Sequence, residues 1–265
     1  MALGLAGAGN SGTVLASLFV PTLAVMLGWH NVLGLAALPL MLVFVLFLFT
    51  AKNSPQCPPR KTLADYGRIL KSQDAWLLMF FYAISFGGFV GLSSFLPIYF
   101  HDQFGLAPIK AGYFTAACVF AGSFARPFGG ALADRIGGTR SLSFVYLIVA
   151  GILFFVARGT LPATTTLLLF ILAMSALGMG NGAVFQLVPQ RFRQDVGLMT
   201  GLVGMTGGIG GFYLAASLGY AQQFTGSYEF GFSLFAGMAL VAFVGIVSVR
   251  PRWRRESATM VTARI

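Results

Sequence analysis

Long apolar runs alternate with short polar segments along the whole chain. At 1.5 Å per helical residue, runs of about 20 residues cross the roughly 30 Å of hydrocarbon in a bilayer. The pattern therefore predicts eight membrane-spanning helices, at residues 3–27, 32–50, 76–100, 108–133, 141–157, 163–187, 196–220 and 228–249. The run at 141–157 is near the shortest length that spans.

Composition supports a protein that resides in a lipid bilayer. The chain is 57% hydrophobic and 9% charged, with a mean hydropathy of +0.82, which is too apolar for a water-soluble fold. The net charge of +10 would suit nucleic acid, but the basic residues are scattered between apolar runs, so no nucleic-acid partner is expected. Cys57 is in a polar loop and Cys118 in an apolar run, so neither a disulfide nor a metal site is indicated.

The basic residues also predict the orientation. Fourteen of the seventeen Lys and Arg residues lie in one set of alternate polar segments, whereas Lys110 and Arg158 lie in the opposite set and Arg126 lies inside a run. Basic residues in short loops concentrate on the cytoplasmic side. The sequence thus predicts a multi-pass protein of the cell inner (cytoplasmic) membrane with both termini in the cytoplasm.

A weak internal repeat suggests how the spans are grouped. The pattern Gly4–Ala8 recurs 197 residues later as Gly201–Met205. Each copy begins the second-to-last span before a basic polar segment. If this interval is six helices, residues 1–50 are the last two helices of an N-terminal half and residues 76–250 are a complete C-terminal half. Residues 51–75 would then be a cytoplasmic linker and residues 251–265 a basic cytoplasmic tail. Four helices of the first half would be missing.

Arg126 is the charged residue inside a predicted span. An arginine at this depth costs about 2.5 to 3.5 kcal/mol unless it is paired, and all seven Asp and Glu residues lie in loops, tails or span ends. Arg126 can reach the interface or backbone carbonyls, or it can bind a dissolved anion in a water-filled cavity. Its planar N–H fork suits a planar oxyanion.

Other candidates for the same site are polar or small. Tyr82, Ser85 and Asn10 fall inside spans, where each can donate to an anion or bond a neighbouring helix. The aromatics around Tyr82 are interpreted as packing or as a cavity wall.

Glycines follow one face of the run at 196–220, with the spacing of Gly197, Gly201, Gly204, Gly208 and Gly211. Such a face allows close helix packing, and it also leaves room beside a small ligand, for which Gly204 and Gly208 are candidates.

The chain contains few groups that could relay protons. His30 and His101 lie at span ends, and the carboxylates lie outside the spans. Exchange of one anion for another, or a coupling group in further helices, therefore fits better than proton-coupled symport through these spans.

The segment from Gly130 to Arg140 resembles the cytoplasmic loop motif of the major facilitator superfamily, and it follows the second helix of the complete half, as in that family. The resemblance implies an all-α membrane protein with that fold. It also implies that Asp134 and Arg135 pair with each other and with helix ends to hold an inward gate.

Three further segments resemble the nitrate/nitrite porter family. They are the glycine-rich stretches Gly4–Thr13 and Gly201–Tyr213, and the segment Gly178–Pro189 just before the second of them. The resemblance implies that Arg126 is one of two arginines that bind the anion, with Tyr82 and Asn10 beside it. The second arginine would lie on a helix that this sequence does not contain.

The expected function is therefore secondary active transport of nitrate, nitrite or both by alternating access, without a cofactor, metal or chemical step. An enzyme is not expected, because the sequence has no nucleophile paired with a base. Two alternatives remain: a transporter of another small anion, or a non-transporting fragment or subunit. In the latter case a separate polypeptide would supply the missing helices.

Overall fold

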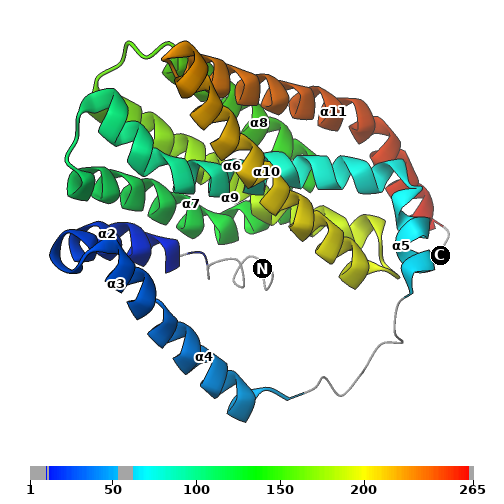
Figure 1. Ribbon diagram of the computed structural model, residues 1–265. Coiled ribbons are helices and arrows are strands. Elements are labelled where there is room, and N and C mark those ends of the chain that lie inside the picture. The colour runs from blue at the N-terminus through cyan, green and yellow to red at the C-terminus, as the bar shows by residue number, and fades with distance from the viewer. Residues whose placement is uncertain (1–9, 11, 53–61, 263–265) are drawn as a thin grey trace.

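The structure is a computed structural model that describes residue 10, residues 12–52 and residues 62–262, with side chains through Glu256 (Figure 1). All regular secondary structure in this described part is helical, so the prediction of an all-α protein is confirmed. The first copy of the glycine repeat, Gly4–Ala8, lies outside the described residues, as does Cys57.

Seven helical segments of the described part are long and apolar enough to cross a membrane, against eight predicted spans. The difference falls on the predicted span 3–27, of which the structure describes residue 10 and α2, Gly12–Leu27. This helix is apolar, but its sixteen residues are fewer than the about 20 that a spanning helix needs. The other seven predicted spans coincide with observed ones, which confirms a multi-pass membrane protein.

Six long helices form a bundle after the linker (Figure 1). They are α6 (Gln73–Phe104), α7 (Pro108–Ile136), α8 (Gly138–Ala157), α9 (Ala163–Arg191), α10 (Val196–Thr225) and α11 (Glu229–Thr262). The most extensive contacts join α7 to α9, α6 to α10 and α8 to α11, so helices that are not consecutive in the sequence become neighbours.

Glycines determine how closely these pairs approach. A Cβ atom built at Gly129 of α7 would lie 2.2 Å from a backbone oxygen of α9, and one at Gly178 of α9 would lie 2.0 Å from a backbone oxygen of α7. At the contact of α6 with α10, a Cβ atom at Gly210 would lie 2.2 Å from a backbone oxygen of α6. Since these distances are far below van der Waals contact, no side chain fits unless the helices move apart.

Among the first described helices, α2 makes the extensive contact with the bundle. A Cβ atom at Gly112 of α7 would lie 2.6 Å from the carbonyl oxygen of Ser17, so α2 packs closely on α7. The helices α3 (Trp29–Leu35) and α4 (Ala37–Thr50) follow, and α4 extends away from the bundle (Figure 1). None of the residues of α4, all of which the structure describes, is buried. Because α4 is apolar on every side, lipid can cover the surface that it exposes.

The predicted linker 51–75 contains a short helix, α5 (Leu63–Leu70). Its start is stabilised by a capping box, in which the backbone N–H of Thr62 donates to Oδ2 of Asp65 over 2.8 Å. The next helix, α6, begins at Gln73 and not at the predicted residue 76.

The predicted tail from residue 251 onward is helical as far as Thr262, because α11 continues through Pro251. Proline removes one helical hydrogen bond. Contacts of Arg252 and Trp253 with Asp74 hold this extension on the bundle and offset that loss. The division of the chain into two halves stays a prediction.

The ends of the bundle differ in charge. At one end, here called the basic end, Arg68 of α5 contacts Asp195 over 3.1 Å and Arg191 of α9 contacts Asp74 of α6. At the opposite end, the hydroxyl of Tyr228 donates to Asp102 over 2.9 Å. Segments that the charge pattern placed on one side therefore lie together in space. That the basic end faces the cytoplasm stays a prediction.

Candidate functional site

Arg126 lies in the middle of α7 and is 4% exposed. Its position is fixed by the contact of α7 with α9, since a Cβ atom at Gly182 of α9 would lie 2.7 Å from the carbonyl oxygen of Arg126. The glycine-rich segment Gly178–Pro189 therefore supports the backbone that carries the arginine. The sequence had connected this segment to a family resemblance without assigning it that role.

Neutral groups make the contacts described for the guanidinium. The Arg126 Cζ atom lies 5.0 Å from the ring centre of Phe86 and 5.2 Å from that of Phe89. The side-chain amide of Asn10 lies 2.7 Å from Nη1 and 3.0 Å from Nη2. Because a guanidinium only donates, the amide oxygen is the atom that faces it, and this oxygen accepts from both nitrogens. Asn10 thus occupies the fork in the manner of an oxyanion.

Tyr82 belongs to the same aromatic wall. Its ring stacks on Phe86 with centres 5.1 Å apart and meets Phe185 of α9 edge-on at 4.9 Å. Tyr82, Phe86 and Phe89 are spaced four and three residues apart, so they share one face of α6. Tyr82 and Arg126 are also close enough to interact electrostatically. The structure therefore places Tyr82 and Asn10 beside Arg126.

Ser85 is fully buried, but its described contacts lie elsewhere. A Cβ atom at Gly180 of α9 would lie 3.1 Å from Cβ of Ser85, so this serine packs between α6 and α9. Its hydroxyl oxygen has no hydrogen-bond partner among the described residues. The predicted role of Ser85 at the anion remains a prediction.

The predicted glycine face of α10 divides into two parts. Gly201, Gly204 and Gly208 face open space, with no described atom within 4 Å of a Cβ atom built there. In contrast, a Cβ atom at Gly207 would lie 2.6 Å from Phe86 and 2.7 Å from Tyr82. Gly207 is therefore the glycine that packs against the aromatic wall, whereas the role of Gly204 and Gly208 beside the anion stays a prediction.

The predicted gating loop joins α7 to α8. Gly130 is buried, and a Cβ atom at Gly182 would lie 2.7 Å from its nitrogen. Asp134, Arg135 and Arg140 are exposed, and no hydrogen bond or ion pair joins their side chains to other residues that the structure describes. Pairing within this loop therefore stays a prediction.

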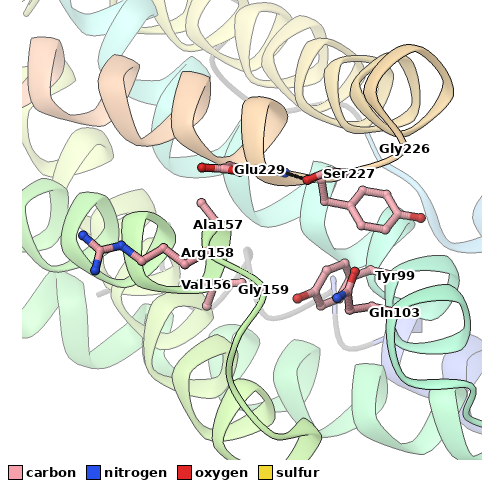
Figure 2. A pocket seen from close by; sticks show the side chains of 10 residues that line it. Tyr99, Gln103, Val156, Ala157, Arg158, Gly159, Gly226, Ser227 and Glu229 are labelled. Carbon is pink, nitrogen blue, oxygen red and sulfur yellow. Dashed lines mark hydrogen bonds between the residues drawn. The ribbon is translucent and has the colours of Figure 1, made fainter.

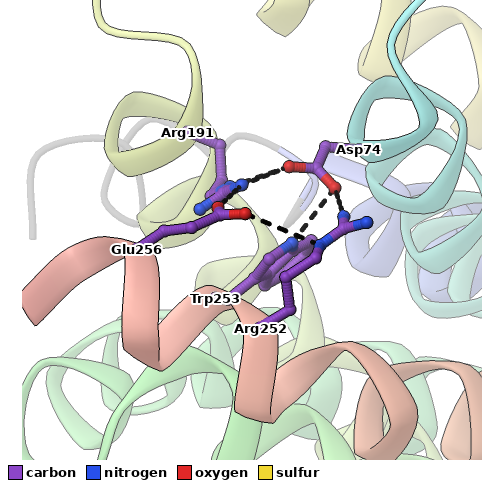
Figure 3. A network of polar contacts seen from close by, with 5 residues as sticks. All are labelled: Asp74, Arg191, Arg252, Trp253 and Glu256. Atoms are coloured by element: carbon purple, nitrogen blue, oxygen red, sulfur yellow. Dashed lines mark hydrogen bonds and ion pairs between the residues drawn. The ribbon is translucent and has the colours of Figure 1, made fainter. Parts of the chain in front are cut away.

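The charged contacts at the basic end come from other residues (Figure 3). Asp74 accepts hydrogen bonds from Arg191, from Arg252 and, over 3.1 Å, from the indole nitrogen of Trp253. Arg191 also contacts Glu256. This cluster joins α6, α9 and α11. The sequence had placed Asp74 at a helix end, but nothing in the spacing indicated that residues so far apart would meet.

A polar pocket of about 210 Å³ lies at the opposite end (Figure 2). Tyr99, Gln103 and Glu229 line it together with Arg158, whose side chain extends away from Tyr99 and Gln103 in Figure 2. Because the lining includes a carboxylate and the arginine points away, this pocket does not favour an anion.

Comparisons with known proteins agree with the resemblance noted in the sequence. The family profile described as Major Facilitator Superfamily matches residues 1–215. A protein named nitrite extrusion protein from Bacillus subtilis is 32% identical over 246 residues, covering 92% of this chain and 62% of that protein. A probable nitrate/nitrite antiporter from Thermus thermophilus is 32% identical, and the match again covers 92% of this chain and 62% of that protein.

A probable nitrate transporter from Staphylococcus carnosus is 32% identical and is covered to 63% of its length. The chain thus spans less than two thirds of these relatives. Their names describe transport proteins, in agreement with the expectation that the chain is not an enzyme.

Proposed function

The chain belongs to the Major Facilitator Superfamily, and on that premise we propose that it forms part of a secondary transporter that moves nitrate, nitrite or both. The names of its relatives supply the substrate class. Movement would follow the alternating access of two helical halves around a central site. The proposed location is the inner membrane, with the basic end and both termini in the cytoplasm.

The buried Arg126 carries the proposal. Nitrate and nitrite are planar anions whose oxygens can accept from both nitrogens of one guanidinium. The Asn10 amide oxygen accepts from Nη1 and Nη2 in this way, which supports a role of the fork in binding an oxygen acceptor. A substrate oxygen can take this position when Asn10 turns aside, and Asn10 then donates its NH2 group to the anion.

The aromatic wall supports a weakly hydrated anion. Phe86 and Phe89 lie over the guanidinium and exclude water from one side, which strengthens the attraction between Arg126 and the anion. Tyr82 places a hydroxyl near the same arginine and is the proposed second donor.

The open face of α10 is the proposed contact with further helices. Gly201, Gly204 and Gly208 expose backbone over two turns, and small residues of this spacing commonly receive another helix. Those helices, in the same or another polypeptide, would complete the site with a second cation.

Anion competition tests the proposal. The open reading frame that contains these residues is expressed at its genomic locus, and nitrate uptake is measured in inverted and right-side-out vesicles. Nitrite should compete with nitrate, whereas acetate and chloride at the same concentration should not. Vesicles loaded with nitrite should take up nitrate faster if the transporter exchanges the two anions. Equal competition by acetate would favour a carboxylate transporter, and no uptake in either orientation would contradict transport.

A further inference from the structure

A basic pocket of about 230 Å³ lies at the basic end, between the turn that joins α7 to α8, the end of α9 and the extension of α11. Its polar lining includes Gln186, Arg191, Arg250 and Arg254, together with Gly138 at the start of α8. None of the described residues that line it is acidic. The pocket is separate from the site around Arg126, none of whose described contacts line it.

The arginines of this pocket are not equivalent. Arg191 contacts Asp74 and Glu256, so carboxylates on its far side offset its charge. Arg250 and Arg254 form no hydrogen bond or ion pair with any other residue that the structure describes, and they lie one helical turn apart on α11. Like charges at this spacing repel each other. An anion between them would remove that repulsion.

The first turn of α8 adds further positive potential. α8 begins at Gly138, has no side-chain cap and has no acidic residue in its first turn. Gly137, Gly138 and Thr139 line the pocket, so this helix start adjoins the two arginines. The uncapped N–H groups of a helix start and its dipole both favour an anion.

Gln186 supplies an amide on the remaining side. Its Oε1 atom is buried and has no hydrogen-bond partner among the described residues. A Cβ atom at position 138 would lie 2.5 Å from this oxygen, so glycine at that position allows the amide to approach the helix start. Rotation of the amide presents its NH2 group to the pocket.

We propose that this pocket binds a phosphate group. The pocket offers many hydrogen-bond donors, from two guanidinium forks, a helix start and an amide. A phosphate can accept from them on three or four oxygens, whereas a carboxylate has only two. The phosphate belongs either to the head group of an anionic phospholipid or to a soluble phosphate. The proposal does not depend on the identity of the transported anion.

The test compares two pairs of substitutions that remove the same charge. Arg250→Gln with Arg254→Gln changes the pocket, while Lys71→Gln with Arg193→Gln removes two exposed cations near the same end that do not line it. One experiment titrates inorganic phosphate into delipidated protein by calorimetry. The other measures retention of phosphatidylglycerol against phosphatidylcholine by native mass spectrometry.

The pocket pair should weaken phosphate or phosphatidylglycerol binding by about tenfold or more relative to the control pair. Loss in the first experiment identifies a soluble phosphate, and loss in the second alone identifies a lipid head group. Gln186→Glu places a carboxylate beside the phosphate and should give the same loss. This variant keeps the test decisive if the double arginine variant does not fold. Equal binding by the two pairs in both experiments would overturn the proposal.

Discussion

Two arginines, the buried Arg126 and the half-buried Arg191, have opposite surroundings. Arg191 lies at the basic end, where two carboxylates and the face of Trp253, 5.1 Å from its Cζ atom, surround it. Arg126 lies in the centre of α7, where its described contacts are an amide and two aromatic rings. Both arginines lie about 5 Å from an aromatic ring, at 5.0 Å for Arg126 and 5.1 Å for Arg191, so the carboxylates make the difference.

This difference separates a structural arginine from a binding one. Carboxylates from α6 and α11 neutralise Arg191, and an incoming anion would have to displace a full charge. An amide oxygen accepts the same hydrogen bonds as an oxyanion but carries no net charge. A dissolved anion can therefore replace it at a smaller cost, which makes the surroundings of Arg126 suitable for reversible binding.

The largest expected effect comes from the structural arginine. Arg191→Gln should lower the free energy of unfolding by about 3 kcal/mol, because the buried Asp74 would lose the two charged hydrogen bonds that Arg191 donates to its Oδ2 atom, while Arg252 and Trp253 bond only Oδ1. Thermal unfolding in detergent measures this loss. Arg193→Gln, two residues further on and exposed, is the control and should leave stability unchanged. Equal stability of the two variants would remove the distinction between the two arginines.

The helix contact that supports Arg126 should be the next most sensitive. Gly182→Ala places a methyl group against the backbone of α7 and should cost about 1 to 3 kcal/mol of stability. Gly151→Ala adds the same methyl group on the exposed face of α8, where no described atom lies within 4 Å, so it should not lower stability. Stability of both variants can be followed by the same unfolding measurement. A destabilised Gly151→Ala with an unaffected Gly182→Ala would reverse the assignment.

Removing one ring over Arg126 should affect binding more than folding. Phe86→Leu keeps an apolar side chain but removes a cation–π contact, and should raise the KM for nitrate by about tenfold. Phe230→Leu is the matched control, since Phe230 is 62% exposed on α11. Uptake kinetics distinguish the two. An unchanged KM in the Phe86 variant would mean that the ring only fills space.

The smallest expected effect concerns a single hydroxyl. Tyr82→Phe keeps the stacking on Phe86 and removes one donor, so nitrate affinity should fall by about threefold. Competition between nitrate and nitrite in the same vesicles measures this change. A larger loss than that of Phe86→Leu would make the hydroxyl, and not the aromatic face, the main support of Arg126.

Much of the fold could be predicted from the sequence because a bilayer imposes simple rules. The apolar runs correctly predicted seven observed spans. The distribution of Lys and Arg correctly predicted which polar segments lie together at one end of the bundle. The helical extension beyond residue 251 was missed, because Pro251 and a basic composition predict an end, while the contacts with Asp74 that hold the helix come from a distant segment.

The sequence identified the buried charge of the candidate site, but it could not identify most of the residues that surround this charge. A lone arginine in an apolar run is a strong signal, and Asn10 and Tyr82 were placed beside it through the family resemblance. Periodicity alone could not separate Gly207 from Gly204, because glycines close in sequence lie at neighbouring angles and only the position of α6 decides which of them is covered. The sequence left open whether Phe86 and Phe89 are packing residues or a cavity wall, since an aromatic residue has the same pattern in both.

The central claim is that Arg126 binds the transported anion through its two-nitrogen fork, and Arg126→Lys tests it most directly. Lysine keeps the charge but cannot donate to one acceptor from two fixed nitrogens. We predict that this variant inserts into the membrane and unfolds at the parental temperature, while nitrate uptake falls at least about tenfold. Nitrate uptake at the parental rate in a membrane-inserted Arg126→Lys protein would contradict the claim.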